Sequence, residues 1–411
     1  LTDLVDGERV AVRDFVPVRK MATDELGLLD LANDVFYPNN GTGVFTAGFA
    51  RASGEVGGSV EVDVPAGAQL FWQATDLNLM GTVKLVKTGE GTFYPQRDGA
   101  TYAGGTEIRA GVLQLTGLGT THRLGALGSE ITVRAGAAVE LASNYDFYDY
   151  VFTLDGGELR STIGTVASGA SKAHLTHVNV TSNASMTSSS ITGFIGSGYA
   201  PTVLDLQGHE FEVNIPYAIY LSNLTSTPGK IVFRGRWCEC YSKPVDLSAS
   251  TVEVHGNFIV NSNVTEVRFG DYIVCTTDEE DNGEANTTGY TSPVFVHGTF
   301  KPVTTRFTGC TLIDGAKIDL SEFADTFDVV STTRRTLVPH TLLFAEGATI
   351  GVVLGDRRVR NEEKLIAWTP SGTDEPAVKA AFTAEKRPDV LLEVREDGLY
   401  AISNSTIIFI R

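Results

Sequence analysis

An acidic, oxygen-rich segment has the side chains of a metal-binding loop. Asp278, Glu280 and Asn282 place oxygen ligands at positions 1, 3 and 5, as in a calcium-binding loop. Gly283 then stands at position 6, but position 12 is Gly289 instead of the bidentate Glu that closes such a loop. A solvated acidic loop is the favoured interpretation, and calcium held by the three oxygen ligands is the alternative. No other cofactor is expected.

The four cysteines allow three kinds of chemistry. They are Cys238, Cys240, Cys275 and Cys310. Free thiols buried in the fold are the favoured interpretation, because a free cysteine packs as a small hydrophobe. Disulfide bonds in an oxidising compartment are one alternative. Zinc is the other, although the spacing lacks the close cysteine pairs that are usual in structural zinc sites.

One aromatic and acidic run has side chains that suit a glycan. It comprises Tyr145, Asp146, Phe147, Tyr148, Asp149 and Tyr150. Exposed rings beside carboxylates fit the apolar faces and the hydroxyl groups of sugars. Aromatic packing in the core is the favoured interpretation, and glycan stacking on this run is the alternative.

Two histidines share a local pattern, Val-His-Gly-x-Phe, at His255 and His297, 42 residues apart. A metal or catalytic pair would need both side chains on one wall. We instead expect them to occupy equivalent corners of a repeat. The sequence contains no Gly-x-Ser-x-Gly, His-Glu-x-x-His, Walker or dinucleotide motif, so no catalytic residue is assigned.

A regular repeat must position these side chains. Glycines interrupt short β-branched runs at spacings of 22, 22, 25 and 21 residues. They are Gly67, Gly89, Gly111, Gly136 and Gly157. A period in this range, with one strand–glycine–strand corner in each repeat, is typical of a solenoid. One repeat cannot bury its inward face alone, so we expect stacked coils with parallel strand pairing, and positive φ at the corner glycines.

The predicted fold is therefore an all-β, single-stranded parallel β-helix of roughly 12–13 coils. Residues 55–356 hold the repeat. Residues 1–54 form an N-terminal lead-in or cap, with a short helix expected at 23–32. Residues 357–411 form a C-terminal capping segment with a β-hairpin, whose Asp397-Gly398 pair favours a type I′ turn.

Two motifs in this repeat resemble a known family. The first reads Lys-Thr-Gly-Glu-Gly-Thr-Phe at 87–93, and the second reads Thr-Tyr-Ala-Gly-Gly-Thr-Glu-Ile-Arg-Ala-Gly-Val-Leu at 101–113. Over residues 83–141 the chain is similar to the autotransporter passenger-associated repeat family, with Phe93 in place of the usual aliphatic residue. The resemblance implies a right-handed β-helix that is secreted or displayed on the cell surface. It does not imply an enzyme.

Composition excludes several classes of protein. The 411 residues include 32 Lys and Arg against 50 Asp and Glu, a net charge of −18, which disfavours nucleic acid as a partner. No apolar run is long enough for a transmembrane helix. With 42% hydrophobic residues, the chain is able to bury a core. Because it begins at Leu1, we expect a processed product or a piece of a longer precursor.

The favoured function is that of a non-catalytic, extracellular or surface β-helix protein with a structural, adhesive or glycan-binding role. Its expected partner is a polysaccharide or a glycan of a host or cell surface, and it is expected to be a monomer. The first alternative is a β-helix carbohydrate-active enzyme, either a polysaccharide lyase or a glycoside hydrolase. The second is a trimeric solenoid like a phage tail fibre.

Overall fold

A computed structural model describes the chain over most of its predicted repeat. The described residues are 2–5, 8–11, 58–64, 66–67, 69–72, 83–95, 102–115, 124–126, 128–141, 145–161, 173–188, 192–196, 201–215, 218–240, 243–260, 264, 266–275, 294–303, 309–323, 326–329, 342–368 and 378–404. Every regular element in these ranges is a β-strand, so the all-β prediction is confirmed there. A search of the same ranges for a helix able to span a membrane finds none.

The chain divides into two compact units, Leu1–Pro216 and Tyr217–Arg411. The first unit contains β1 (Thr2–Val5), β2 (Glu8–Ala11), β3 (Gly58–Asp63), β4 (Gln69–Trp72), β5 (Val83–Thr88), β6 (Thr92–Pro95), β7 (Thr106–Ile108), β8 (Gly111–Leu115), β9 (Glu130–Arg134), β10 (Ala137–Leu141), β11 (Tyr145–Asp155), β12 (Glu158–Ser161), β13 (Ala173–Ser182), β14 (Ala184–Ser188), β15 (Thr192–Gly196), β16 (Thr202–Asp205) and β17 (Glu210–Asn214).

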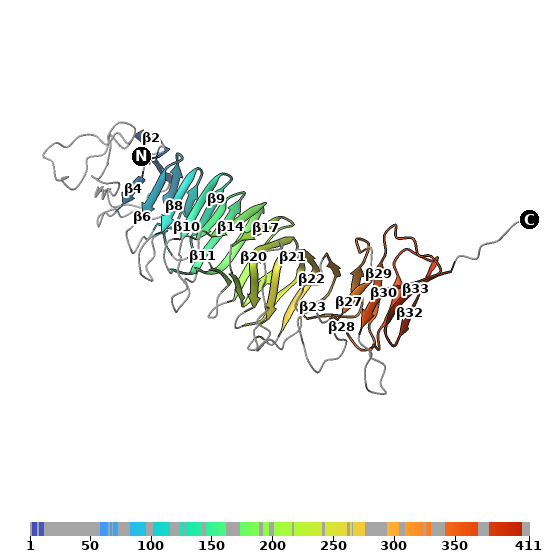
Figure 1. The fold of residues 1–411 in the computed structure, drawn as a ribbon. Helices are drawn as coiled ribbons and strands as arrows, with labels where there is room; N and C mark the ends of the chain where they lie inside the picture. Colours follow the sequence, from blue (N-terminus) through green and yellow to red (C-terminus); the bar gives the residue numbers. More distant parts are fainter. Residues whose placement is uncertain are drawn as a thin grey trace, which may run out of the picture. The chain divides into compact units, whose positions relative to one another are not determined.

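Two parallel ladders organise the first unit, in which successive strands of each ladder lie side by side (Figure 1). One ladder aligns Val60, Leu85, Thr106, Ile131, Phe152, Val178 and Leu204. The other aligns Leu70, Phe93, Leu113, Val139, Leu159, Met186 and Val213. All aligned side chains from Leu85 and from Phe93 onward are buried. Rows of buried residues, apolar except for Thr106, therefore stack through the interior.

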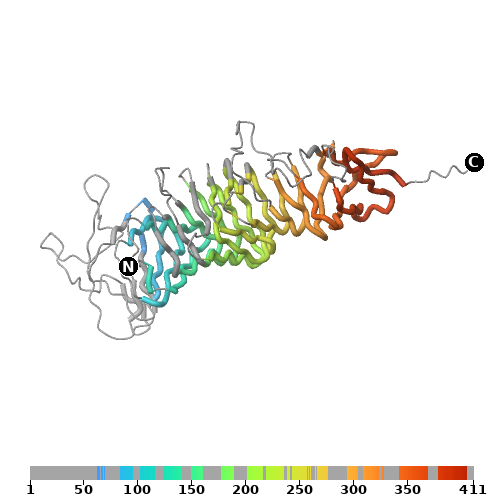
Figure 2. The backbone as a smooth tube through the Cα atoms, turned by 90° about the horizontal axis from the view of Figure 1, so that it is seen from below, coloured from blue at the N-terminus to red at the C-terminus, as the bar shows by residue number. Residues whose placement is uncertain are grey.

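The spacing along these ladders confirms the predicted period. Aligned residues of the first ladder are 25, 21, 25, 21, 26 and 26 residues apart. The tube in Figure 2 follows successive turns of this backbone beside one another. The first unit is thus solenoid-like, with each turn paired in parallel to the one before it.

The second unit contains β18 (Ala218–Ser222), β19 (Leu224–Ser226), β20 (Lys230–Cys240), β21 (Val245–Val260), β22 (Val267–Cys275), β23 (Val294–Val296), β24 (Thr299–Pro302), β25 (Cys310–Leu312), β26 (Lys317–Asp319), β27 (Phe327–Val329), β28 (Leu342–Phe344), β29 (Thr349–Val353), β30 (Glu362–Trp368), β31 (Ala381–Ala384), β32 (Val390–Arg395) and β33 (Gly398–Ser403). Its main ladder aligns Leu224, Val245, Val267, Val294, Cys310 and Leu342. The separations are 21, 22, 27, 16 and 32 residues, so the repeat is less regular here.

Aromatic rings fill the interior of the second unit. The ring centroids of Phe258 and Phe269 are 5.2 Å apart, and those of Phe269 and Tyr272 are 5.1 Å apart, both in edge-to-face geometry. Phe300 continues the row at 5.7 Å from Tyr272. Edge-to-face pairs of this kind add stabilisation beyond the area they bury, so they fix how neighbouring strands pack.

A separate sheet of four strands, in the order β27-β30-β33-β32, lies near the end of the chain. The predicted hairpin is present: β32 and β33 pair antiparallel, from Val390 opposite Ser403 to Arg395 opposite Gly398. The predicted type I′ turn is wrong, because neither central residue, Glu396 or Asp397, has a positive φ. Gly398 is the first residue of β33 and pairs with Arg395 of β32, so it is not a central residue of the turn.

The corner prediction holds for four of the five glycines. Gly67, Gly89, Gly111 and Gly136 have φ between +66° and +79°. At the fifth corner the residue is Gly156, with φ +73°, and not Gly157 as predicted. Gly157 is required for a different reason, since a Cβ there would lie 2.5 Å from the carbonyl oxygen of Val133.

The predicted division into residues 1–54, 55–356 and 357–411 stays a prediction. Within the first segment, β1 pairs antiparallel with both β2 and β3, so it lies along the first strand of the ladder. Toward the other end, β31 adds in parallel to β29. The helix expected at 23–32 lies outside the described residues.

Candidate functional site

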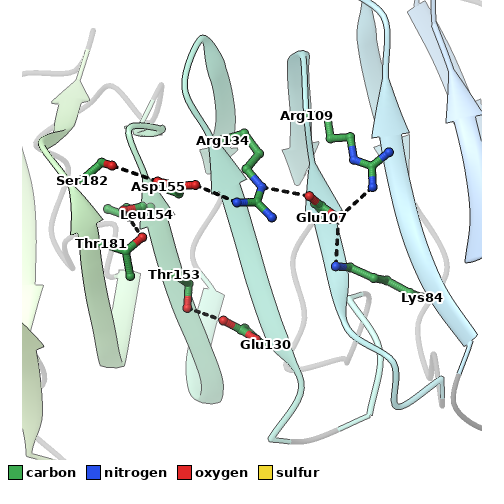
Figure 3. Close-up of polar contacts among 10 residues, drawn as sticks. All are labelled: Lys84, Glu107, Arg109, Glu130, Arg134, Thr153, Leu154, Asp155, Thr181 and Ser182. Carbon is green, nitrogen blue, oxygen red and sulfur yellow. Dashed lines mark hydrogen bonds and ion pairs between the residues drawn. The ribbon is translucent and has the colours of Figure 1, made fainter.

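A row of charged side chains crosses the strands of the first unit, centred on Glu107 of β7 (Figure 3). The Glu107 side chain is only 5% exposed. One of its oxygens accepts from Lys84 Nζ at 2.8 Å and from Arg109 Nη2 at 3.2 Å. The other accepts from Arg134 Nε at 2.8 Å. Three cations on neighbouring turns thus converge on one buried carboxylate.

The row continues toward later strands. Arg134 also donates from Nη1 to Asp155 at 2.6 Å, and Ser182 donates to the same carboxylate at 2.9 Å. We call the six residues Lys84, Glu107, Arg109, Arg134, Asp155 and Ser182 the Glu107 ladder. Burial alone would raise the pKa of Glu107, but the three donors outweigh it and lower this pKa to about 2. The carboxylate is therefore ionised at neutral pH, which suits a structural role and not proton donation.

The family-like motifs supply groups that hold the corners. Lys87 is fully buried, and its ammonium group donates to the carbonyls of Thr88, Gly89 and Ala110 at 2.6–3.0 Å. Burial lowers the pKa of Lys87 to about 8, so the side chain remains mostly protonated at neutral pH. One lysine thereby satisfies carbonyls on two successive corners, because Gly89 and Ala110 belong to neighbouring turns.

The second motif works in the same way through a tyrosine. Tyr102 is buried, and its hydroxyl lies 2.7 Å from Thr106 Oγ1. Its backbone carbonyl accepts from the N–H of Ala126 at 2.8 Å. Between them, Gly105 has φ +80° and approaches the carbonyl of Glu130 so closely that a Cβ would lie 2.6 Å from that oxygen. The Tyr-x-Gly-Gly-Thr spacing therefore encodes one corner and its contact with the next turn.

The second unit holds the one group of three potential metal ligands found among the described residues: Glu253, His255 and Cys275, which we call the Glu253 cluster. Register places His255 on β21 directly beside Cys275 on β22. Glu253 lies two residues before His255, on the same face of its strand. The donor atoms of all three lie within 4.8 Å of one another, and each residue is partly exposed.

Basic side chains surround this cluster. Lys230 Nζ lies 2.8 Å from Glu253 Oε2, and Arg234 Nη1 lies 3.0 Å from His255 Nε2. His255 Nε2 is also 2.6 Å from Glu253 Oε1. Burial raises the pKa of Glu253, but its bonds to Lys230 and His255 prevail and lower it. Burial raises the pKa of the Cys275 thiol, so this cysteine is not an activated nucleophile.

All four cysteines are free thiols in the structure, as the favoured interpretation predicted. Cys238, Cys240 and Cys310 are buried in the core of the second unit. Cys275 is the exception, since it is partly exposed beside His255. Burial raises the pKa of each of the three core thiols, which keeps them protonated and unreactive.

Tyr272 lies in the same core with a hydroxyl oxygen that has no hydrogen-bond partner. We expect Tyr272→Phe to raise the free energy of unfolding by about 1 kcal/mol, because it removes a buried polar group whose desolvation is uncompensated. Tyr102→Phe is the matched change at a tyrosine whose hydroxyl is bonded to Thr106, and it should lower the same quantity by about 1 kcal/mol. Urea denaturation of both variants measures the difference. A loss of stability in Tyr272→Phe would contradict the assignment.

The aromatic run forms the first half of strand β11. Tyr150 is buried, and its hydroxyl donates to the carbonyl of Gly125 at 3.0 Å. Its ring therefore packs in the interior and presents no face to a sugar. The side chains of Tyr145, Asp146, Phe147, Tyr148 and Asp149 lie outside the description, so glycan stacking stays a prediction for those five residues.

The other sequence candidates have different outcomes. Asp278, Glu280 and Asn282 lie outside the described residues, so calcium binding there stays a prediction.

The expectation that His255 and His297 occupy equivalent corners is wrong. In the strand pairing, Val254 lies opposite Val274, and Val274 lies opposite Pro302. Val296 instead lies opposite Phe269, so the two histidine motifs are not aligned. His255 thus lies on a strand, and His297 follows β23 as an exposed residue.

The Glu253 cluster is not apparent in the sequence, because Cys275 lies 20 residues after His255 and glutamate is a common residue type. One signal was present. Glu253 and His255 alternate on one face of a predicted strand, and Cys275 follows His255 by 20 residues, close to one repeat. Residues one repeat apart on stacked strands are neighbours.

Comparison of the chain with protein-family models, with curated proteins and with solved structures finds no match.

Proposed function

We propose that the chain is a non-catalytic, right-handed parallel β-helix protein, secreted or displayed at a cell surface, with a structural, adhesive or glycan-binding role. The observation that carries this proposal is the pair of in-register parallel ladders in the first unit, with buried apolar rows repeated every 20–27 residues. Such stacking gives a scaffold whose outward side chains are free to vary. The handedness and the location rest on the passenger-type motifs.

The motif residues support the proposal by what they do. Lys87, Tyr102, Gly105 and Gly111 each bond to, or closely approach, the backbone of a neighbouring turn. These are roles in stacking, not in chemistry on a substrate. Motif residues that hold the corners of this chain agree with the β-helix that the resemblance implies.

The ionisation of the acidic groups also favours a non-catalytic role. A general acid that cleaves glycosidic bonds needs a raised pKa. In the described part of the chain, every carboxyl group with a clearly shifted pKa has a lowered pKa. In each case the hydrogen bonds and charges of its partners lower the pKa more than burial raises it. These groups are Glu107, Asp155, Glu253, Glu362, Asp389 and Asp397.

A binding screen and an activity screen on the same full-length preparation test the proposal. We expect retention on at least one polysaccharide or surface glycan of an array, with no release of reducing or unsaturated sugar ends. Light scattering after size exclusion should give a monomer. Sugar release with turnover would favour the enzyme instead, and a stable trimer would favour a fibre-like solenoid.

A further inference from the structure

The ligand set of the Glu253 cluster is mixed and rigidly placed. It offers one thiol sulfur, one imidazole nitrogen and one carboxylate oxygen from two adjacent strands. The backbone of β21 and β22 is paired in register from Thr251 opposite Asp271 to His255 opposite Cys275. The three donors are therefore brought together by the sheet itself, without a mobile loop.

The contacts at His255 contain a conflict that a cation would resolve. Nε2 lies 2.6 Å from an oxygen of Glu253, where only a nitrogen that donates is favourable. The same atom lies 3.0 Å from Arg234 Nη1, where only a nitrogen that accepts is favourable. One ring nitrogen cannot do both. A metal ion bound to the lone pair of Nε2 and to Glu253 Oε1 would let both atoms act as acceptors toward one cation, with Arg234 turned away from Nε2.

We propose that Glu253, His255 and Cys275 bind a divalent transition-metal ion, for which Zn²⁺ is the best chemical match. Zinc takes sulfur, nitrogen and oxygen ligands together, and three protein ligands leave a fourth position for water. Harder ions such as Ca²⁺ and Mg²⁺ prefer oxygen ligands alone. The proposal is independent of the proposed function, since a scaffold and an enzyme are equally able to carry such a site.

The geometry requires only small movements. Tetrahedral zinc with bonds of about 2.0–2.3 Å separates its donor atoms by roughly 3.3–3.6 Å. The donors of the cluster already lie within 4.8 Å of one another. Glu253 Oε1 and His255 Nε2 would separate slightly from 2.6 Å to admit the ion. Lys230 bonds the other oxygen, Oε2, and so leaves Oε1 for the metal.

The surrounding cations set how tightly the ion binds. Lys301 is paired with Glu322 at 2.6 Å, and Lys230 is paired with Glu253, so their charges are largely compensated. Arg234 is the cation that contacts the ligand nitrogen itself. It must turn away when the metal binds, and its charge opposes that of the ion. Removing the charge of Arg234 should therefore strengthen metal binding. If the three residues formed only a hydrogen-bonded cluster, the same change would remove a stabilising contact.

Titration of the reduced, metal-free full chain with Co²⁺ tests the site, because thiolate-to-cobalt charge transfer appears only when a cysteine is a ligand. We expect one Co²⁺ per chain with this absorption, displaced by Zn²⁺. Cys275→Ser should abolish the absorption, and Glu253→Gln should weaken binding about tenfold or more. Arg234→Gln should tighten binding several-fold. The controls Cys310→Ala and His297→Gln, which alter a thiol and an imidazole outside the cluster, should bind as the unaltered chain does.

Two results would overturn the proposal. One is a folded, reduced chain that shows no charge-transfer absorption with Co²⁺. The other is absorption that survives in Cys275→Ser, which would place the metal elsewhere. If Cys275→Ser does not fold, the variants His255→Gln and Arg234→Gln test the site instead. Loss of the absorption in His255→Gln with tighter binding in Arg234→Gln supports the site, and unchanged binding in either contradicts it.

Discussion

Replacing Gly111 with Ala is expected to lower the free energy of unfolding of the surrounding strands by at least about 3 kcal/mol. Gly111 begins β8 with φ +66°, a conformation that costs an L-residue about 1–2 kcal/mol. A Cβ there would also lie 2.5 Å from the carbonyl oxygens of both Gly89 and Gly91. These are backbone atoms of the preceding corner, so they cannot move without breaking the pairing between β6 and β8.

Gly136→Ala is the matched control. Gly136 has φ +79°, but a Cβ there would meet no atom within 4 Å. Gly136→Ala should therefore lower the free energy of unfolding only by the cost of a positive φ, about 1–2 kcal/mol. Hydrogen exchange of the peptides that contain β6, β8 and β10 measures both losses locally. Equal losses in the two variants would show that the close approach between successive corners has no energetic effect.

Glu107→Gln is expected to lower the free energy of unfolding by about 3 kcal/mol at pH 7. The folded state holds the pKa of Glu107 at about 2, against an ordinary value of 4.5, because Lys84, Arg109 and Arg134 stabilise the carboxylate. A depressed pKa contributes stability that is complete above the unfolded value. It is lost as the pH falls from about 4.5 toward 2, since the unfolded chain then binds a proton that the folded chain does not.

The variant should therefore approach the unaltered chain in stability as the pH falls through this window. Urea denaturation followed by circular dichroism at several pH values between 7 and about 2 measures the convergence. Glu346→Gln is the matched control, because Glu346 is 78% exposed in its pair with Lys379. Its effect should be close to zero at every pH. A constant deficit for Glu107→Gln across the range would show that lost packing, not charge, explains its cost.

Much of the fold follows from local patterns along the chain. The glycine spacing predicts the period, and the alternation of apolar residues predicts which side chains stack, as Phe93, Leu113 and Val139 do. Details that depend on a neighbouring turn are not available from such patterns. Gly157 shows this, because its small size is required by the carbonyl of Val133, 24 residues earlier, and not by its own φ.

The polar sites depend even more on register. Glu107, Arg134 and Asp155 look like unrelated surface charges in the sequence, and become a ladder only when three turns are aligned. A change of one residue in pairing moves a side chain to the opposite face of a sheet. The repeated Val-His-Gly-x-Phe pattern shows the risk, because the actual register places His255 beside Cys275 and leaves His297 exposed.

The separation of aligned residues has a consequence for how the first unit comes apart. In the described residues from β5 to β14, each strand of the two ladders pairs with the strands about one repeat before and after it in the chain. No contact that closes a ladder therefore requires distant parts of the unit to meet first, and assembly can begin at any turn and spread in both directions. Loss of structure should likewise proceed by fraying and by internal opening of a few turns, instead of in a single cooperative step.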